Sequence, residues 1–119
     1  MPPVSMPGTQ RIDLKLPPGL LEGEEYEAVA EAFAAKDAAR LAEMLDSLVE
    51  EAPEADAVLV RRRFFRTLLS FARAMVLSGK LPRHQAFRNV EFVEEAYRRC
   101  EKSMKAEPVL SYLLDRFAF

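Results

Sequence analysis

The side chains that most often carry chemistry in proteins are few in this chain. It has one histidine, His84, and one cysteine, Cys100, among 119 residues. A nucleophilic dyad would require these two to meet, but Cys100 belongs to an apolar helix stripe, which favours a small core residue. His84 stands between basic residues in a segment that we predict to be an exposed turn. We therefore predict no catalytic residues and a protein that is not an enzyme.

Carboxylates are the remaining candidates for chemistry, because they can hold metal ions or act as paired acid and base. They gather in two helical segments, which contain Glu24, Glu25, Glu27 and Glu31, and Glu91, Glu94 and Glu95. A carboxylate di-iron bundle would need Glu-x-x-His units, and His84 does not stand three residues after a glutamate. A single cysteine excludes an internal disulfide and a cysteine-rich zinc site. Acidic clusters on helices are usually solvated faces, so we predict no metal and no cofactor.

Length and composition indicate one domain with its own core. The chain is 50% apolar and 30% charged, which suits a globular protein of this size. No run approaches the roughly 18 apolar residues that a membrane span needs. The first ten residues, MPPVSMPGTQ, lack the charged and apolar regions of a signal peptide. We predict a cytoplasmic protein without a membrane partner.

The formal net charge of -2 conceals a strong asymmetry between the two halves of the chain. Residues 1–60 hold 4 basic and 13 acidic groups, whereas residues 61–119 hold 13 basic and 6 acidic groups. From Arg61 to Arg88 there are eight basic residues and no acidic one. Such a division predicts either a charged partner or two halves that face each other.

The helix predicted over residues 53–78 carries most of this basic charge on one side. On a helical wheel, Phe64, Phe65 and Phe71 fall on a broad apolar arc, and Arg61 points toward it. The opposite arc carries four arginines: Arg62, Arg63, Arg66 and Arg73. Guanidinium groups on such a stripe can be solvated, pair with the acidic helices, contact a protein partner, or hold nucleic-acid phosphates. An isoelectric point near 5.5 and buried phenylalanines disfavour nucleic acid.

Apolar residues recur at helical spacing from Glu24 to the end of the chain. Residues 24–51 form either one long helix or a hairpin divided at Lys36, with Asp37 as the cap of the second helix. After the helix over 53–78, which stops at Gly79, we predict helices over 85–105 and from Glu107 onward. The leucines and phenylalanines of this last helix either dock into the core or form a patch for a partner, and docking is the expectation.

Residues 1–22 do not follow the helical pattern, because five of the eight prolines lie here. Between these prolines, Ile12, Leu14 and Leu16 alternate with charged residues, which is the period of a strand. One short strand is not stable alone, so it packs on its own domain, pairs with a second copy, or joins a partner's sheet edge.

The fold class predicted from these patterns is all-α. We expect a compact bundle of four to five helices over residues 23–119, preceded by an extended, proline-bounded arm over residues 1–22. We predict a non-enzymatic protein-interaction module, a homodimer or a small subunit of a larger assembly. The alternative is a small helical subunit that binds nucleic-acid backbone non-specifically through the arginine stripe. The predicted partner-binding residues are Ile12, Leu14, Leu16, Arg62, Arg63, Arg66 and Arg73.

Overall fold

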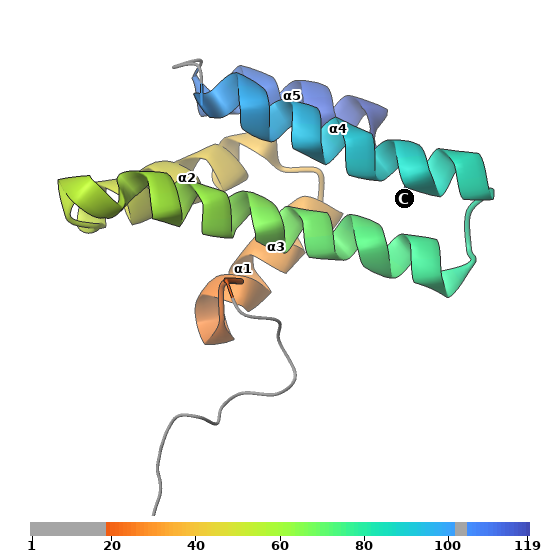
Figure 1. Ribbon diagram of the computed structural model, residues 1–119, viewed down its shortest axis with the longest axis horizontal. Helices are drawn as coiled ribbons and strands as arrows, with labels where there is room; N and C mark the ends of the chain where they lie inside the picture. Colours follow the sequence, from red (N-terminus) through yellow and green to blue (C-terminus); the bar gives the residue numbers. More distant parts are fainter. Residues whose placement is uncertain (1–18, 102–104) are drawn as a thin grey trace, which may run out of the picture.

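Five α-helices make up most of residues 19–101 and 105–119, the part of the chain that the computed structural model describes. They are α1 (Gly23–Ala34), α2 (Ala38–Glu51), α3 (Ala57–Ser78), α4 (Arg83–Glu101) and α5 (Ala106–Arg116), with a 3₁₀ turn, η1 (Glu54–Asp56), before α3 (Figure 1). No strand occurs in these two ranges. The predicted all-α class and the five helices are therefore confirmed.

The predicted N-terminal arm lies mostly outside the described residues, and this includes Ile12, Leu14 and Leu16. Its last residues pack against the helices, since Leu20 and Leu21 are both buried. The backbone N–H of Leu21 donates to the hydroxyl of Thr67 on α3 at 3.0 Å. Leu20 and Leu21 therefore belong to the hydrophobic core, although they precede the first helix.

A tight hairpin joins α1 to α2, which decides between the two arrangements open for residues 24–51. The backbone turns at Lys36, whose φ of 58° is left-handed. The N–H groups of Lys36 and Asp37 donate to the carbonyls of Phe33 and Ala32, at 3.0 and 2.9 Å. This is a Schellman ending for α1. The Asp37 side chain then accepts the Arg40 N–H at 3.1 Å and caps α2, as predicted.

The longest helix, α3, packs along α4 as an antiparallel pair (Figure 1). Gly79 ends α3 with a φ of 71°, as the sequence predicts. The fourth helix, predicted from about Gln85, begins two residues earlier at Arg83, because the carbonyl of Pro82 already accepts the N–H of Ala86 at 3.0 Å and proline suits a helix start. His84 therefore lies in the first helical turn of α4, where it is exposed, and not in a loop. At the other end, η1 separates Pro53 from α3, which begins at Ala57.

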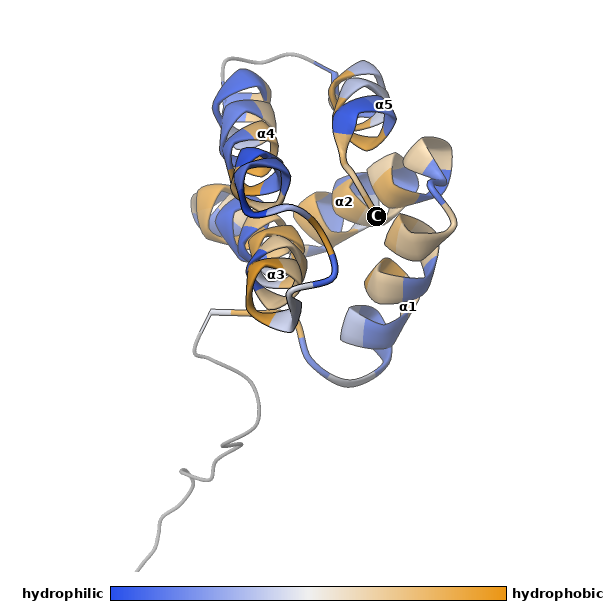
Figure 2. Cartoon of the chain, turned by 90° about the vertical axis from the view of Figure 1, so that its right-hand side faces the viewer, coloured by the Kyte–Doolittle hydropathy of each residue, from blue (hydrophilic) through white to orange (hydrophobic). Residues whose placement is uncertain are grey.

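The core lies where the apolar sides of the helices face one another (Figure 2). Phe64, Leu41 and Leu110, from three different helices, are completely buried. The predicted docking of the C-terminal group is confirmed, because Phe117 is buried and its ring meets that of Phe33 edge-on at 4.8 Å between centroids. Among the described helices, none combines the length and apolar character that crossing a bilayer requires.

Candidate interaction surface

The predicted arginine stripe lies on the exposed side of α3. Arg62, Arg63, Arg66 and Arg73 are all exposed. Two leucines that the sequence analysis did not single out share this side, Leu59 with 52% and Leu77 with 87% of its surface exposed. At about 100° per residue, all six positions fall within one arc of about 100°. We call these six residues the arginine face: Leu59, Arg62, Arg63, Arg66, Arg73 and Leu77.

The four guanidinium groups are not neutralised by the acidic helices. Within the described ranges, the carboxylate–cation pairs closer than 4.0 Å are Glu31–Arg40 and Glu95–Arg99, and neither involves α3. Arg62 instead donates through Nε to the hydroxyl of Tyr97 on α4 at 3.5 Å, and this contact raises the pKa of Arg62. Arg62 is therefore cationic at any physiological pH.

A hollow of about 230 Å³ lies between the arginine face and α4. Its lining combines the apolar Phe65, Leu69 and Val93 with Tyr97 and with three charged side chains, Arg62, Arg66 and Glu94. A guanidinium fork binds a carboxylate or a phosphate through two parallel hydrogen bonds. The hollow therefore presents an apolar surface beside charged groups of both signs, two guanidinium groups and the Glu94 carboxylate.

The segment that enters the bundle from the N-terminal arm passes beside this face. Arg66 Nη1 lies 3.0 Å from the point where a Cβ on Gly19 would stand, so its guanidinium group lies against the backbone there. The hydroxyl of Thr67 accepts from Leu21 and donates to the carbonyl of Arg63 at 2.9 Å. The buried Thr67 hydroxyl thus joins the backbone of Leu21 to that of α3.

Replacing Thr67 by valine is expected to lower the free energy of unfolding by about 1–2 kcal/mol. Valine has nearly the same shape but leaves the buried N–H of Leu21 without an acceptor. Urea unfolding followed by circular dichroism measures the loss. Ser70→Ala is the control, because that hydroxyl donates to a carbonyl of its own helix, and a change below about 0.5 kcal/mol is expected. Equal losses in the two variants would contradict the anchoring role of Thr67.

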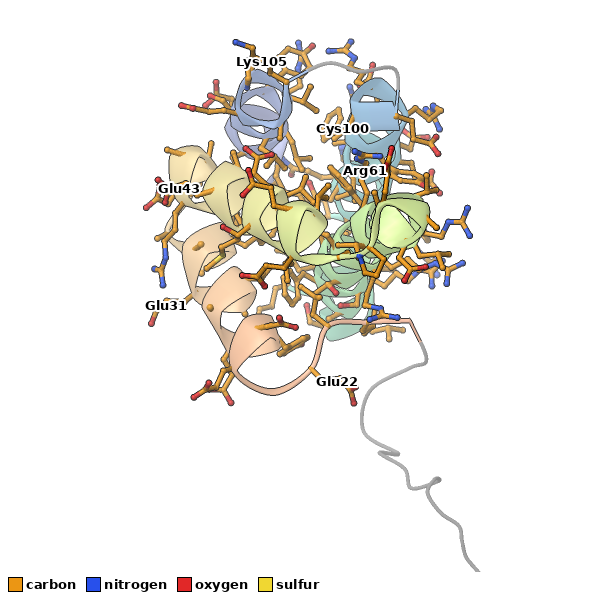
Figure 3. The ribbon with its side chains drawn as sticks, turned by 90° about the vertical axis from the view of Figure 1, so that its left-hand side faces the viewer. Glu22, Glu31, Glu43, Arg61, Cys100 and Lys105 are labelled. Atoms are coloured by element: carbon orange, nitrogen blue, oxygen red, sulfur yellow. The ribbon has the colours of Figure 1, made fainter. Side chains whose placement is uncertain are left out.

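Arg61 differs from its neighbours because it turns toward the apolar side of α3, as the helical wheel predicts. It is half-buried and lines a cleft of about 930 Å³ between α2, the end of α4 and the start of α5. Figure 3 shows Arg61 beside Cys100. Burial raises the pKa of the Cys100 thiol, and the positive charge of Arg61 opposes this only in part. The thiol is therefore protonated at neutral pH and is a poor nucleophile, in keeping with its predicted place in the core.

The structure keeps the other chemistry-bearing side chains apart. His84 and Cys100 lie at opposite ends of α4, about 24 Å apart along its axis at about 1.5 Å per residue. No dyad forms between them. Over residues 19–101 and 105–119, no three side chains of the histidine, cysteine, aspartate and glutamate classes converge closely enough to hold a metal ion.

Comparison of the chain with protein-family models, with characterised proteins and with solved structures finds no match. The distinctive features of the surface are the exposed Leu59 and Leu77 and the four arginines of α3, which have no carboxylate partner among the described residues. These arginines are opposite in charge to the acidic α1 and α2.

Proposed function

We propose that this chain is a non-enzymatic protein-interaction module that associates with itself, as a homodimer or as a small subunit of a larger assembly. The observation that carries the proposal is the arginine face, where four exposed guanidinium groups have no carboxylate partner among the described residues and two leucines are exposed beside them. Arginine is enriched in protein–protein interfaces relative to the rest of the protein surface. The buried, reduced thiol of Cys100 fits the cytoplasmic setting that we propose for it.

A protein partner suits this face better than nucleic acid does. Phe64 and Phe65 are buried, and the ring of Phe71 contacts Tyr26 and Phe33, so none of the three is presented for stacking on bases. Leucines gain more from an apolar protein contact than from a phosphate backbone. The acidic first half of the chain would also repel a polyanion but attract the arginine face of a second copy.

The alternating residues Ile12, Leu14 and Leu16 form the second part of the proposed contact. They lie outside the described residues, and the proposal rests on their strand-like spacing between prolines. A segment of this kind can add to a partner by pairing its backbone, while its apolar side chains fix the register.

Sedimentation velocity of the full-length chain over a range of concentrations tests this function. Reversal of three face charges, in Arg62→Glu/Arg66→Glu/Arg73→Glu, is expected to weaken self-association about tenfold or more. Serine at Ile12, Leu14 and Leu16 is expected to weaken it in the same direction. The matched control reverses three exposed arginines of α4, Arg83, Arg88 and Arg98, and is expected to leave association unchanged.

Three results would contradict the proposal. A wild-type chain that sediments as a monomer at every concentration would exclude self-association. Equal weakening in the α4 control would show that net charge, and not the arginine face, is responsible. Salt-dependent retention of wild type on an oligonucleotide, lost in the α3 variant, would favour the nucleic-acid alternative.

A further inference from the structure

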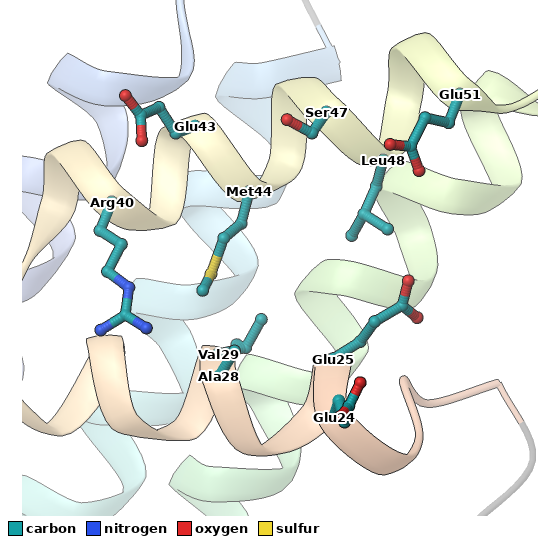
Figure 4. A pocket seen from close by; sticks show the side chains of 10 residues that line it. All are labelled: Glu24, Glu25, Ala28, Val29, Arg40, Glu43, Met44, Ser47, Leu48 and Glu51. Atoms are coloured by element: carbon teal, nitrogen blue, oxygen red, sulfur yellow. The ribbon is translucent and has the colours of Figure 1, made fainter.

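A groove of about 420 Å³ runs between α1 and α2, on a surface that the arginine face does not share. Figure 4 shows Met44 and Leu48 of α2 pointing toward Ala28 and Val29 of α1, which gives the groove an apolar floor. Met44 and Leu48 are only half-buried. Methionine and leucine side chains of this kind can rearrange around an inserted apolar group.

Three carboxylates surround one end of this groove. Glu24 and Glu25 come from the first turn of α1, and Glu51 is the last residue of α2, so all three lie at the same end of the groove as Leu48 (Figure 4). The single basic lining residue, Arg40, lies toward the other end, where it pairs with Glu31 at 3.1 Å. In the described part of the chain, no cation lies within 4.0 Å of the three carboxylates.

The position of Glu51 adds an electrostatic reason for a cationic occupant. A carboxylate at the C-terminus of a helix faces the negative end of the helix dipole, which disfavours it. Glu24 and Glu25 are favourably placed at the N-terminus of α1, but they bring two further negative charges to the same end of the groove. A positive group from another molecule would offset both the unfavourable helix dipole at Glu51 and its repulsion by Glu24 and Glu25.

We propose that this groove receives the arginine face of a second copy of the chain, an inference that rests on the self-association proposed above. Leu59 would lie over the apolar floor near Leu48, and the arginines that follow it would meet the three carboxylates. Leu59, Arg62 and Arg66 are spaced at i, i+3 and i+7, which is the pattern by which one helix face occupies a groove. Each copy carries both surfaces, and their charges are opposite.

The contact joins two different surfaces, so it is isologous if two copies make it reciprocally and heterologous if successive copies continue it. Two copies can satisfy it reciprocally and close as a pair, or successive copies can continue it as a ring or chain. In every case the acidic end of one groove is covered by the basic face of the next copy.

A charge exchange tests this pairing of surfaces. The groove variant is Glu24→Lys/Glu25→Lys/Glu51→Lys, and the face variant is Arg62→Glu/Arg66→Glu/Arg73→Glu, both in the full-length chain. Each variant alone is expected to associate about tenfold more weakly than wild type, because its own groove and face now repel each other. An equimolar mixture is expected to regain association, because lysine grooves then meet glutamate faces and arginine faces meet glutamate grooves. Sedimentation velocity measures all three samples.

Two controls keep the result specific. Glu91, Glu107 and Asp115 are exposed carboxylates outside the groove, and their change to lysine is expected to leave association unaffected. If the groove variant shows reduced helical circular dichroism, Glu24→Gln/Glu25→Gln/Glu51→Gln replaces it. This milder variant is expected to weaken association less but in the same direction.

Three other outcomes would overturn this inference, and each one contradicts a different part of it. A wild-type chain that is always a monomer overturns both this inference and the proposed function. A groove variant that associates like wild type overturns the groove and leaves self-association to another surface. Two weakened variants whose mixture stays weak overturn the pairing of this groove with this face.

Discussion

The Phe64→Ala variant is expected to lose about 3–5 kcal/mol of its free energy of unfolding, out of a total of about 5–15 kcal/mol for a chain of this kind. Phe64 is completely buried on α3, and its ring meets that of Phe65 edge-on at 5.5 Å between centroids. Alanine removes the transfer free energy of the ring and leaves a cavity, since close-packed helices relax only in part. The midpoint of thermal unfolding is expected to fall on the order of 15–30 °C.

Urea unfolding of wild type and of Phe64→Ala, followed by circular dichroism, measures this difference. Phe87→Ala is the matched control, because Phe87 on α4 is 50% exposed and its loss is expected to stay within about 0.5 kcal/mol. The slope of the free energy against urea is expected to be equal in the three chains. A loss below about 1 kcal/mol for Phe64→Ala would contradict the placement of this ring at the centre of the core.

The local features of the fold are those that the sequence predicts best. Asp37 and Gly79 act through their own backbone neighbours, as an N-cap and as a left-handed stop, so their effect is visible in the sequence alone. The apolar stripes likewise predict which side of each helix is buried, because that depends only on helical spacing. The outward direction of the four arginines of α3 follows from the same spacing.

The turn between α1 and α2 shows where local rules are insufficient. Lys36 adopts a left-handed conformation, which costs most residues other than glycine and asparagine about 1–2 kcal/mol. A lysine at this position therefore does not by itself predict a left-handed turn. Its Nζ lies 5.0 Å from the centre of the Phe119 ring, a cation–π contact that offsets part of this cost. That contact joins residues far apart in the chain, so sequence spacing could not predict it.

Only the charged residues of the candidate interaction surface were predicted from the sequence. The arginines of this face were predicted from the sequence, but Leu59 and Leu77 were not, although the same helical wheel places both leucines among them. The groove between α1 and α2 could not be predicted, because the arrangement of residues 24–51 was open until the hairpin was observed. Glu24, Glu25 and Glu51 come together only through that hairpin.

A substitution at Asn89 is expected to have the second-largest effect on stability, because this side chain holds the C-terminus of the chain against α4. Asn89 is completely buried. Its Nδ2 donates to the carbonyl of Ala118, and its Oδ1 accepts the N–H of Ala118, both at 2.8 Å. The paired bonds keep the preceding residue, Phe117, in the core against Phe33.

The Asn89→Ala variant is expected to lose about 2–3 kcal/mol, because both polar groups of Ala118 lose their partners in a partly buried position. Urea unfolding gives the loss, and hydrogen exchange at the Ala118 amide is expected to become faster in the variant. Gln85→Ala, at an exposed position of the same helix, is the control and is expected to change neither measurement. If Asn89→Ala leaves exchange at Ala118 unchanged, the C-terminus is held by Phe117 alone, and the two hydrogen bonds do not position it.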